Sequence, residues 1–171
     1  MRFFPRLLSC FAVLASLGFL FPCPAWSAPH DATDGRITIA RVFTGWRDAA
    51  SFKRISEYFS GQENTGGAIV LRTHADQRAG FYFLVRAANP GATVAVKINL
   101  QLIAPTDSKP RTYAFSTELK PGANVLNLGL TAGDWPDAKA NPVAWQIDFL
   151  ATDGHLLTSE KSYLWEKPGA K

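Results

Sequence analysis

The sequence predicts a mainly β domain in which two antiparallel sheets pack face to face, with one α-helix inserted after the first strand. Runs rich in β-branched and aromatic residues recur along the chain, and turn residues separate them about every 8 to 12 positions. Several runs alternate between apolar and polar residues, which places one face against a core and the other in water. One segment follows the period of a helix instead.

The first strand is predicted over residues 36–43. Ile37, Ile39 and Phe43 share one parity and are expected to face the core. Arg41 has the same parity, so this strand is expected to be only half-buried.

The helix is predicted over residues 44–60. Its apolar side chains form one stripe at 3.6 residues per turn: Ala49, Phe52, Ile55 and Phe59. Thr44 or Asp48 is suited to cap its start, and Gly61 is suited to end it.

Seven further strands are predicted from their branched and aromatic residues. They cover residues 68–73, 81–88, 93–103, 111–119, 124–130, 143–152 and 156–165. Residues 81–88 are apolar on both parities, which is typical of a central strand. Residues 105–110 contain two prolines and are interpreted as a loop. The core-facing residues of two strands are expected to be Val94, Val96, Ile98, Leu100, Leu102, Val143, Trp145, Ile147 and Phe149.

The last two runs resemble the closing hairpin of immunoglobulin-like sandwiches. The resemblance rests on residues 145–149, the turn residues Asp153 and Gly154, and residues 162–165. It implies an immunoglobulin-like sandwich without the cysteine pair of antibody-type domains. Because that architecture hosts many activities, it implies no particular function.

The N-terminal segment, residues 1–27, is predicted to be a signal peptide. Arg2 and Arg6 precede an apolar run over 7–21, and Ala25 and Ser27 provide the small residues of a cleavage site after Ser27. Residues 28–35 are then a flexible lead-in, 36–166 a single β-sandwich domain and 167–171 a C-terminal tail. The protein is expected to be exported, to the periplasm or the cell exterior, and to meet a membrane only through the removed signal segment.

Composition excludes several function classes. Both cysteines, Cys10 and Cys23, lie in the segment to be removed, so the mature chain has no thiol chemistry and no disulfide. The net charge of +4 includes Arg2 and Arg6, and no run of Lys or Arg follows them, which argues against nucleic-acid binding. No cofactor is expected. No metal is expected either, because His30, Asp31 and Asp34 are interpreted as part of a polar tail.

Sequence motifs of common enzymes are absent. The sequence has no HExxH, GxSxG, GxGxxG or GxxxxGK[ST] pattern, so no catalytic residue is assigned and a non-enzyme is favoured.

Four residues are candidates for binding. Arg72, His74 and Arg78 occupy one loop with Asp76, where guanidinium groups are suited to grip an anion; the alternative is a solvated turn with local ion pairs. Trp135 lies in a loop before Pro136, where an exposed ring would suit a sugar; the alternative is a lid over one end of the sandwich.

The leading hypothesis is a non-catalytic binding module of the bacterial envelope, with an envelope protein or a glycan as its partner. One alternative is a small hydrolase acting on glycan, in which Glu57 and Glu63 supply paired carboxylates. Another alternative is a structural subunit that assembles through sheet edges. The sequence specifies no oligomeric state.

Overall fold

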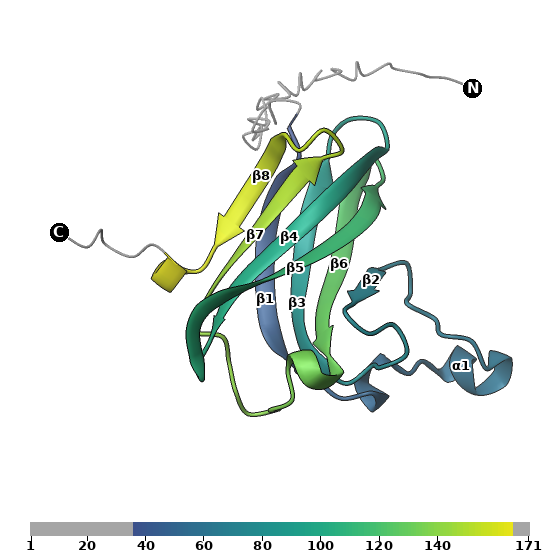
Figure 1. Cartoon of the computed structure of the whole chain (residues 1–171). Coiled ribbons are helices and arrows are strands. Elements are labelled where there is room, and N and C mark those ends of the chain that lie inside the picture. The colour runs from purple at the N-terminus through teal and green to yellow at the C-terminus, as the bar shows by residue number, and fades with distance from the viewer. Residues whose placement is uncertain (1–35, 166–171) are drawn as a thin grey trace, which may run out of the picture. The chain divides into compact units, whose positions relative to one another are not determined.

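The computed structural model describes residues 36–165, which form eight strands and one short α-helix (Figure 1). The strands are β1 (Thr38–Arg47), β2 (Ile69–Arg72), β3 (Gly80–Asn89), β4 (Val94–Ala104), β5 (Asp107–Leu119), β6 (Gly122–Thr131), β7 (Ala144–Ala151) and β8 (Leu156–Lys161). The helix is α1 (Ile55–Ser60), and the 3-10 turns are η1 (Ala50–Phe52), η2 (Ala132–Asp134) and η3 (Tyr163–Trp165). The expected signal peptide (1–27), lead-in (28–35) and tail (167–171) lie outside the described residues.

The strands form two four-stranded sheets. The first sheet has the order β1-β3-β6-β2, and the second has the order β5-β4-β7-β8. Without β2, this is the order of an immunoglobulin-like sandwich, in which strands A, B and E face strands C, F and G. β5 adds to the second sheet beside β4. The predicted two-sheet, immunoglobulin-like fold is therefore confirmed.

One strand pair departs from the antiparallel expectation. β2 pairs with β6 in parallel, whereas the other neighbouring strands pair antiparallel. β1 and β6 are both antiparallel to β3, so β1 and β2 run in the same direction. Parallel strands of one sheet cannot be joined by a tight turn and need a crossover of about a dozen residues or more. The insertion between β1 and β2 is this crossover.

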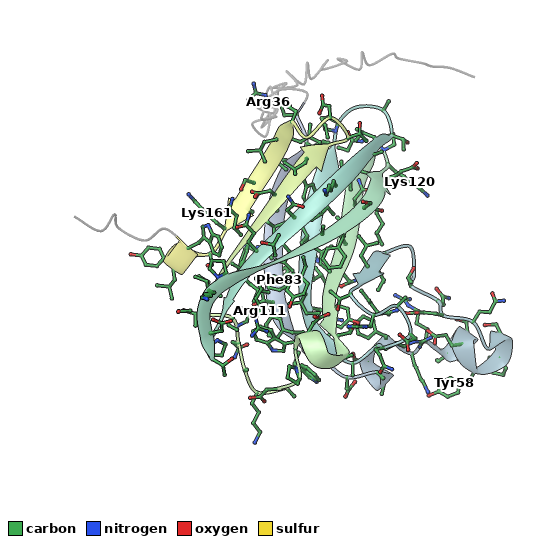
Figure 2. The ribbon with its side chains drawn as sticks, in the orientation of Figure 1. Arg36, Tyr58, Phe83, Arg111, Lys120 and Lys161 are labelled. Atoms are coloured by element: carbon green, nitrogen blue, oxygen red, sulfur yellow. The ribbon has the colours of Figure 1, made fainter. Side chains whose placement is uncertain are left out.

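The core lies between the two sheets. Phe83 lies between them in Figure 2 and is fully buried. The alternation predicted for residues 93–103 is confirmed, because every second side chain of β4 from Val96 to Leu102 is buried. β3 is confirmed as a central strand, between β1 and β6. Other fully buried side chains of the core are Val85, Leu126, Leu128, Leu130, Ile147 and Phe149.

A β-bulge changes which side chains of β1 point toward the core. The pairing with β3 shifts between Ile39 and Arg41, which leaves one extra residue in β1. Ile37 and Ile39 contribute to the core as expected, but after the bulge Val42 and Trp46 take the inward positions. Phe43 is therefore 46% exposed on the outer face of the first sheet, contrary to the prediction. Period-two counting fails here because it assumes an uninterrupted ladder.

The helix is confirmed as an insertion after the first strand, but it is shorter than predicted. Residues 44–47 continue β1, because Thr44 and Trp46 pair with Phe83 and Phe81 of β3. Only six residues become α1, and they do not cover the core: Ile55 is 78% exposed and Phe59 is 87% exposed.

Two strand boundaries also differ from prediction. β5 begins at Asp107, so most of the expected loop 105–110 is strand; Pro110 is tolerated because β5 is an edge strand. β8 ends at Lys161, and the chain continues as η3. Val143 precedes β7 and is 47% exposed rather than part of the core.

The buried alternation of β4 makes a direct prediction about stability. Replacing Leu100, which is fully buried, with Ala should lower the free energy of unfolding by about 2 to 5 kcal/mol, because a cavity remains between the sheets. Urea denaturation monitored by tryptophan fluorescence measures this loss. Leu164→Ala removes the same atoms from a residue that is 62% exposed and should change stability little. Equal losses in the two variants would contradict the assigned facing of β4.

Candidate functional site

The insertion, residues 48–68, is anchored to the outer face of the first sheet by Phe52. Its ring packs on Tyr82 of β3 with 4.6 Å between ring centroids. The guanidinium groups of Arg47 and Arg72 lie 5.7 and 5.2 Å from the Phe52 ring centroid. Tyr82 is only 1% exposed although it lies on the outer face of its sheet, because the insertion covers it.

Tyr82 in turn requires glycine on the neighbouring strand. Gly129 of β6 pairs with Tyr82, and a Cβ atom on Gly129 would come within 2.4 Å of the tyrosine ring. The Tyr82 hydroxyl accepts a hydrogen bond from Arg72 Nε at 2.9 Å and donates one to the Arg78 carbonyl oxygen at 2.7 Å. One side chain therefore connects β2, β3 and the loop between them.

Four charged side chains, Glu57, Glu63, Arg72 and Arg78, form what we call the arginine–glutamate cluster. Arg72 donates from Nη1 and Nη2 to the two carboxylate oxygens of Glu63, at 3.0 and 2.5 Å. Arg78 Nη1 donates to Glu57 Oε2 at 2.7 Å, and its Nε lies 3.7 Å from Glu63 Oε2. The cluster is formally neutral; Glu57 ties α1 to the loop after β2, and Glu63 ties the chain after α1 to β2.

The cluster keeps both carboxylates ionised. The hydrogen bond from Arg78 lowers the pKa of Glu57 below 4.5, and the hydrogen bonds from Arg72 lower that of Glu63 in the same way. The Arg72 side chain is only 6% exposed, and its pKa is raised, first by Glu63. Burial raises the pKa of Tyr82, so its hydroxyl stays protonated at neutral pH.

The four binding candidates occupy three places. Arg72 and Arg78 come together in the cluster. His74 lies apart from it, with Nε2 3.2 Å from Asp134 Oδ2 and its backbone N–H donating to Thr131 Oγ1. Trp135 is 3% exposed, packs on Phe81 at 5.3 Å between centroids and donates from Nε1 to the Ala140 carbonyl oxygen.

Sequence reasoning missed the pairing of the two arginines with the two glutamates. Glu57 is 21 positions from Arg78, and Glu63 is nine positions from Arg72. No local spacing indicates such contacts, because only the crossover brings them together. Within the cluster, the guanidinium groups of the arginines bind the carboxylate oxygens of the glutamates.

The most exposed apolar side chains of the insertion lie on α1. Ile55, Tyr58 and Phe59 are 78%, 75% and 87% exposed. Figure 1 shows α1 standing away from both sheets, and Figure 2 shows Tyr58 there. A helix of six residues has too few internal hydrogen bonds to persist alone. Its C-terminal Gly61, at φ +67°, and the contacts of Glu57 hold it in place.

Residues 36–165 were also searched for a metal site and for a helix that could span a membrane, and neither was found there. No group of three or more His, Cys, Asp and Glu side chains gathers there in a way that would hold a metal ion. In the same range, none of the helices has both the length and the apolar character needed to cross a bilayer.

Comparisons with known proteins give one distant structural likeness. No protein-family model matches the sequence, and a search of curated proteins finds no match. Among solved structures, an immunoglobulin-like protein from Pseudomonas aeruginosa is similar, with 14% sequence identity and a TM-score of 0.32. The match covers 75% of this chain and 96% of that one. The fold assignment above rests on the strand order of this chain.

The cluster predicts how a neutralised carboxylate affects stability. Glu63→Gln should lower the free energy of unfolding at neutral pH by about 1 to 3 kcal/mol, because the guanidinium of Arg72 loses its ionic partner where water is largely excluded. Urea denaturation measures the effect. Glu118→Gln, on the exposed side of β5, is the matched control and should be close to neutral. A neutral result for both variants would show that Arg72 is not held by Glu63.

The same pair predicts a dependence on pH. A carboxyl group whose pKa is lower in the folded state stabilises the fold above its unfolded pKa, and that stabilisation is lost as pH falls through the folded pKa. The stability difference between the natural protein and Glu63→Gln should therefore be full near neutral pH and shrink below about pH 4. Denaturation curves recorded across this range test the prediction; a difference that grows on acidification would refute it.

Proposed function

We propose that this protein is a non-catalytic, exported interaction module that binds a partner protein of the bacterial envelope through α1. The observation that supports this most is the exposure of Ile55, Tyr58 and Phe59 within six residues. Large apolar side chains in contact with water contribute nothing to this chain's core, and a cluster of them is typical of an interaction surface.

The attachment of α1 favours binding. The Glu57 carboxylate accepts hydrogen bonds from the Asn64 backbone N–H at 3.1 Å and from Arg78 at 2.7 Å. These contacts limit the positions that α1 can adopt before a partner arrives. A presented side chain that is already ordered loses less conformational entropy on binding.

The charge next to α1 indicates the chemistry of the partner. Lys53 lies 6.0 Å from the Tyr58 ring centroid, and Arg54 immediately precedes the helix. Both of these cations are exposed, while the acidic residue of the helix, Glu57, is engaged by Arg78. We therefore expect the partner to offer an apolar pocket with an acidic rim.

The hydrolase alternative has less support. A glycan hydrolase of this kind needs one carboxylic acid whose pKa is raised so that it can protonate a leaving group. The pKa values of both Glu57 and Glu63 are lowered by guanidinium partners. These groups act as fixed anions that hold the insertion.

Assembly through sheet edges also has less support. β5 carries Lys109 and Pro110, and β1 is interrupted by its bulge. Charges, proline and bulges on edge strands oppose pairing with another chain.

Site-specific crosslinking tests the proposal. A photoreactive phenylalanine analogue at position 59, introduced in the source cell, should crosslink to one envelope protein, which mass spectrometry identifies. The purified partner should bind the natural protein, and Ile55→Ser with Phe59→Ser should weaken binding at least tenfold, because the exposed apolar anchors are lost.

The control is Val143→Ser, which removes an apolar side chain that is 47% exposed elsewhere on the domain. It should leave the affinity unchanged. Because Ile55 and Phe59 are already exposed, the double variant should also keep the natural free energy of unfolding. Failure to crosslink, or equal affinity of the α1 variant, would refute docking through α1.

A further inference from the structure

The two sheets differ in the charge that their strands carry. The strands of the first sheet contain four charged residues, and all of them are arginines: Arg41, Arg47, Arg72 and Arg86. The strands of the second sheet contain as many acidic as basic residues: Asp107, Glu118, Asp148, Glu160, Lys97, Lys109, Arg111 and Lys161. Within residues 36–165, Glu63 pairs with Arg72, whereas no carboxylate pairs with Arg41, Arg47 or Arg86. The first sheet is therefore positively charged, and the second is balanced.

Two of these arginines contact an exposed aromatic ring on the outer face of the first sheet. Arg41 of β1 pairs directly with Arg86 of β3, and both are exposed. Their guanidinium groups lie 5.4 and 5.8 Å from the centroid of the Phe43 ring, which is 46% exposed. Val125 of β6 pairs with Arg86 and is 38% exposed. We call Arg41, Phe43, Arg86 and Val125 the arginine–phenylalanine patch.

The patch is not arranged for the stability of the sheet. Side chains that are directly opposite each other on antiparallel strands have Cβ atoms about 5 Å apart, and like charges at such positions destabilise the pairing. Arg41 and Arg86 are opposed in this way, and within residues 36–165 neither has a carboxylate to offset the repulsion. An anionic partner would remove the repulsion and cover the exposed ring of Phe43 at the same time.

We propose that the arginine–phenylalanine patch binds an acidic surface of a partner protein. Carboxylates of the partner pair with Arg41 and Arg86, and an apolar side chain of the partner packs on Phe43 and Val125. The charge of the first sheet is complementary to such a surface and attracts it before contact. The patch lies on the strands of the sheet and does not include α1, so it is a second binding surface of this protein.

The residue types of the sheet favour a protein over other anionic partners. Arginine and aromatic residues are enriched in protein interfaces, and lysine is depleted there. The strands of the first sheet contain no lysine, whereas three of the four basic residues of the second sheet are lysines. A guanidinium can stack on an aromatic ring and pair with a carboxylate through two hydrogen bonds. Anionic membranes and polyanions attract lysine and arginine alike, so they do not account for this difference.

A second copy of this chain does not provide a complementary surface. Contact between two identical patches would bring arginines against arginines. The strands of the second sheet carry equal numbers of acidic and basic residues, so they form no acidic surface for the patch to bind. The charges therefore point to a different protein.

Crosslinking from the patch is the first part of the test. A photoreactive phenylalanine analogue at position 43 of the full chain, expressed in the source cell, should crosslink to one protein that mass spectrometry identifies. The same analogue at Lys97, which is exposed on the second sheet, is the matched control and should not crosslink to that protein. A crosslink from position 43 with none from position 59 would refute docking through α1 and leave this proposal standing. The reverse result would refute this proposal alone.

Binding of the purified partner then connects the contact to the named groups. Arg41→Gln and Arg86→Gln should each weaken binding by about tenfold. Arg86→Lys keeps the charge but loses the planar guanidinium, and it should also weaken binding several-fold. Lys97→Gln makes the same charge change on the second sheet and should leave the affinity unchanged. Each arginine variant should keep the urea midpoint of the natural protein, because Arg41 and Arg86 are exposed and repel each other.

Two further probes represent the other anionic classes. Vesicles of phosphatidylglycerol stand for an anionic membrane, and heparin stands for a soluble polyanion. Both should bind the natural protein more weakly than the purified partner does. Tighter binding of either probe, or full affinity of the partner for Arg86→Gln or Arg86→Lys, would overturn the proposal. Absence of a crosslink from position 43 would overturn it as well.

Discussion

The parallel pairing of β2 with β6 determines where the insertion lies on this protein. Because β1 and β2 run in the same direction, the chain between them must cross the sheet instead of turning back. That crossing brings Phe52 onto Tyr82 and carries Glu57 and Glu63 to Arg78 and Arg72. The exposed helix α1 lies on this crossover.

Most of the sandwich was predictable from sequence because its core strands alternate without interruption. The buried residues of β4 follow that rule, and β3 was identified as a central strand because it is apolar on both faces. The errors occur where tertiary contacts override local pattern. The bulge in β1 turns Phe43 outward, and pairing with β3 draws Thr44 and Trp46 from a predicted helix into a strand. Neither contact has a signature in the residues nearby.

The site was predictable only in part, for a related reason. Local composition identified Arg72, His74 and Arg78 as binding candidates of one loop, and the structure brings Arg72 and Arg78, but not His74, into one cluster. The partners of both arginines lie on the crossover, so no spacing rule connects them. The strands could therefore be predicted from the sequence, whereas the ion pairs and hydrogen bonds could be identified only from the three-dimensional structure.

The crossover is joined to the sandwich by side chains on the outside of one sheet, while the inter-sheet core draws on residues from the strands and from Trp135. The two sets of contacts are thus nearly disjoint. Changes in residues 48–68 can alter what this molecule touches while the apolar interior that makes it fold stays as it is. An architecture of this kind lets mutation explore new recognition properties at small risk to folding, which is one physical basis for the reuse of such sandwiches as adaptable scaffolds.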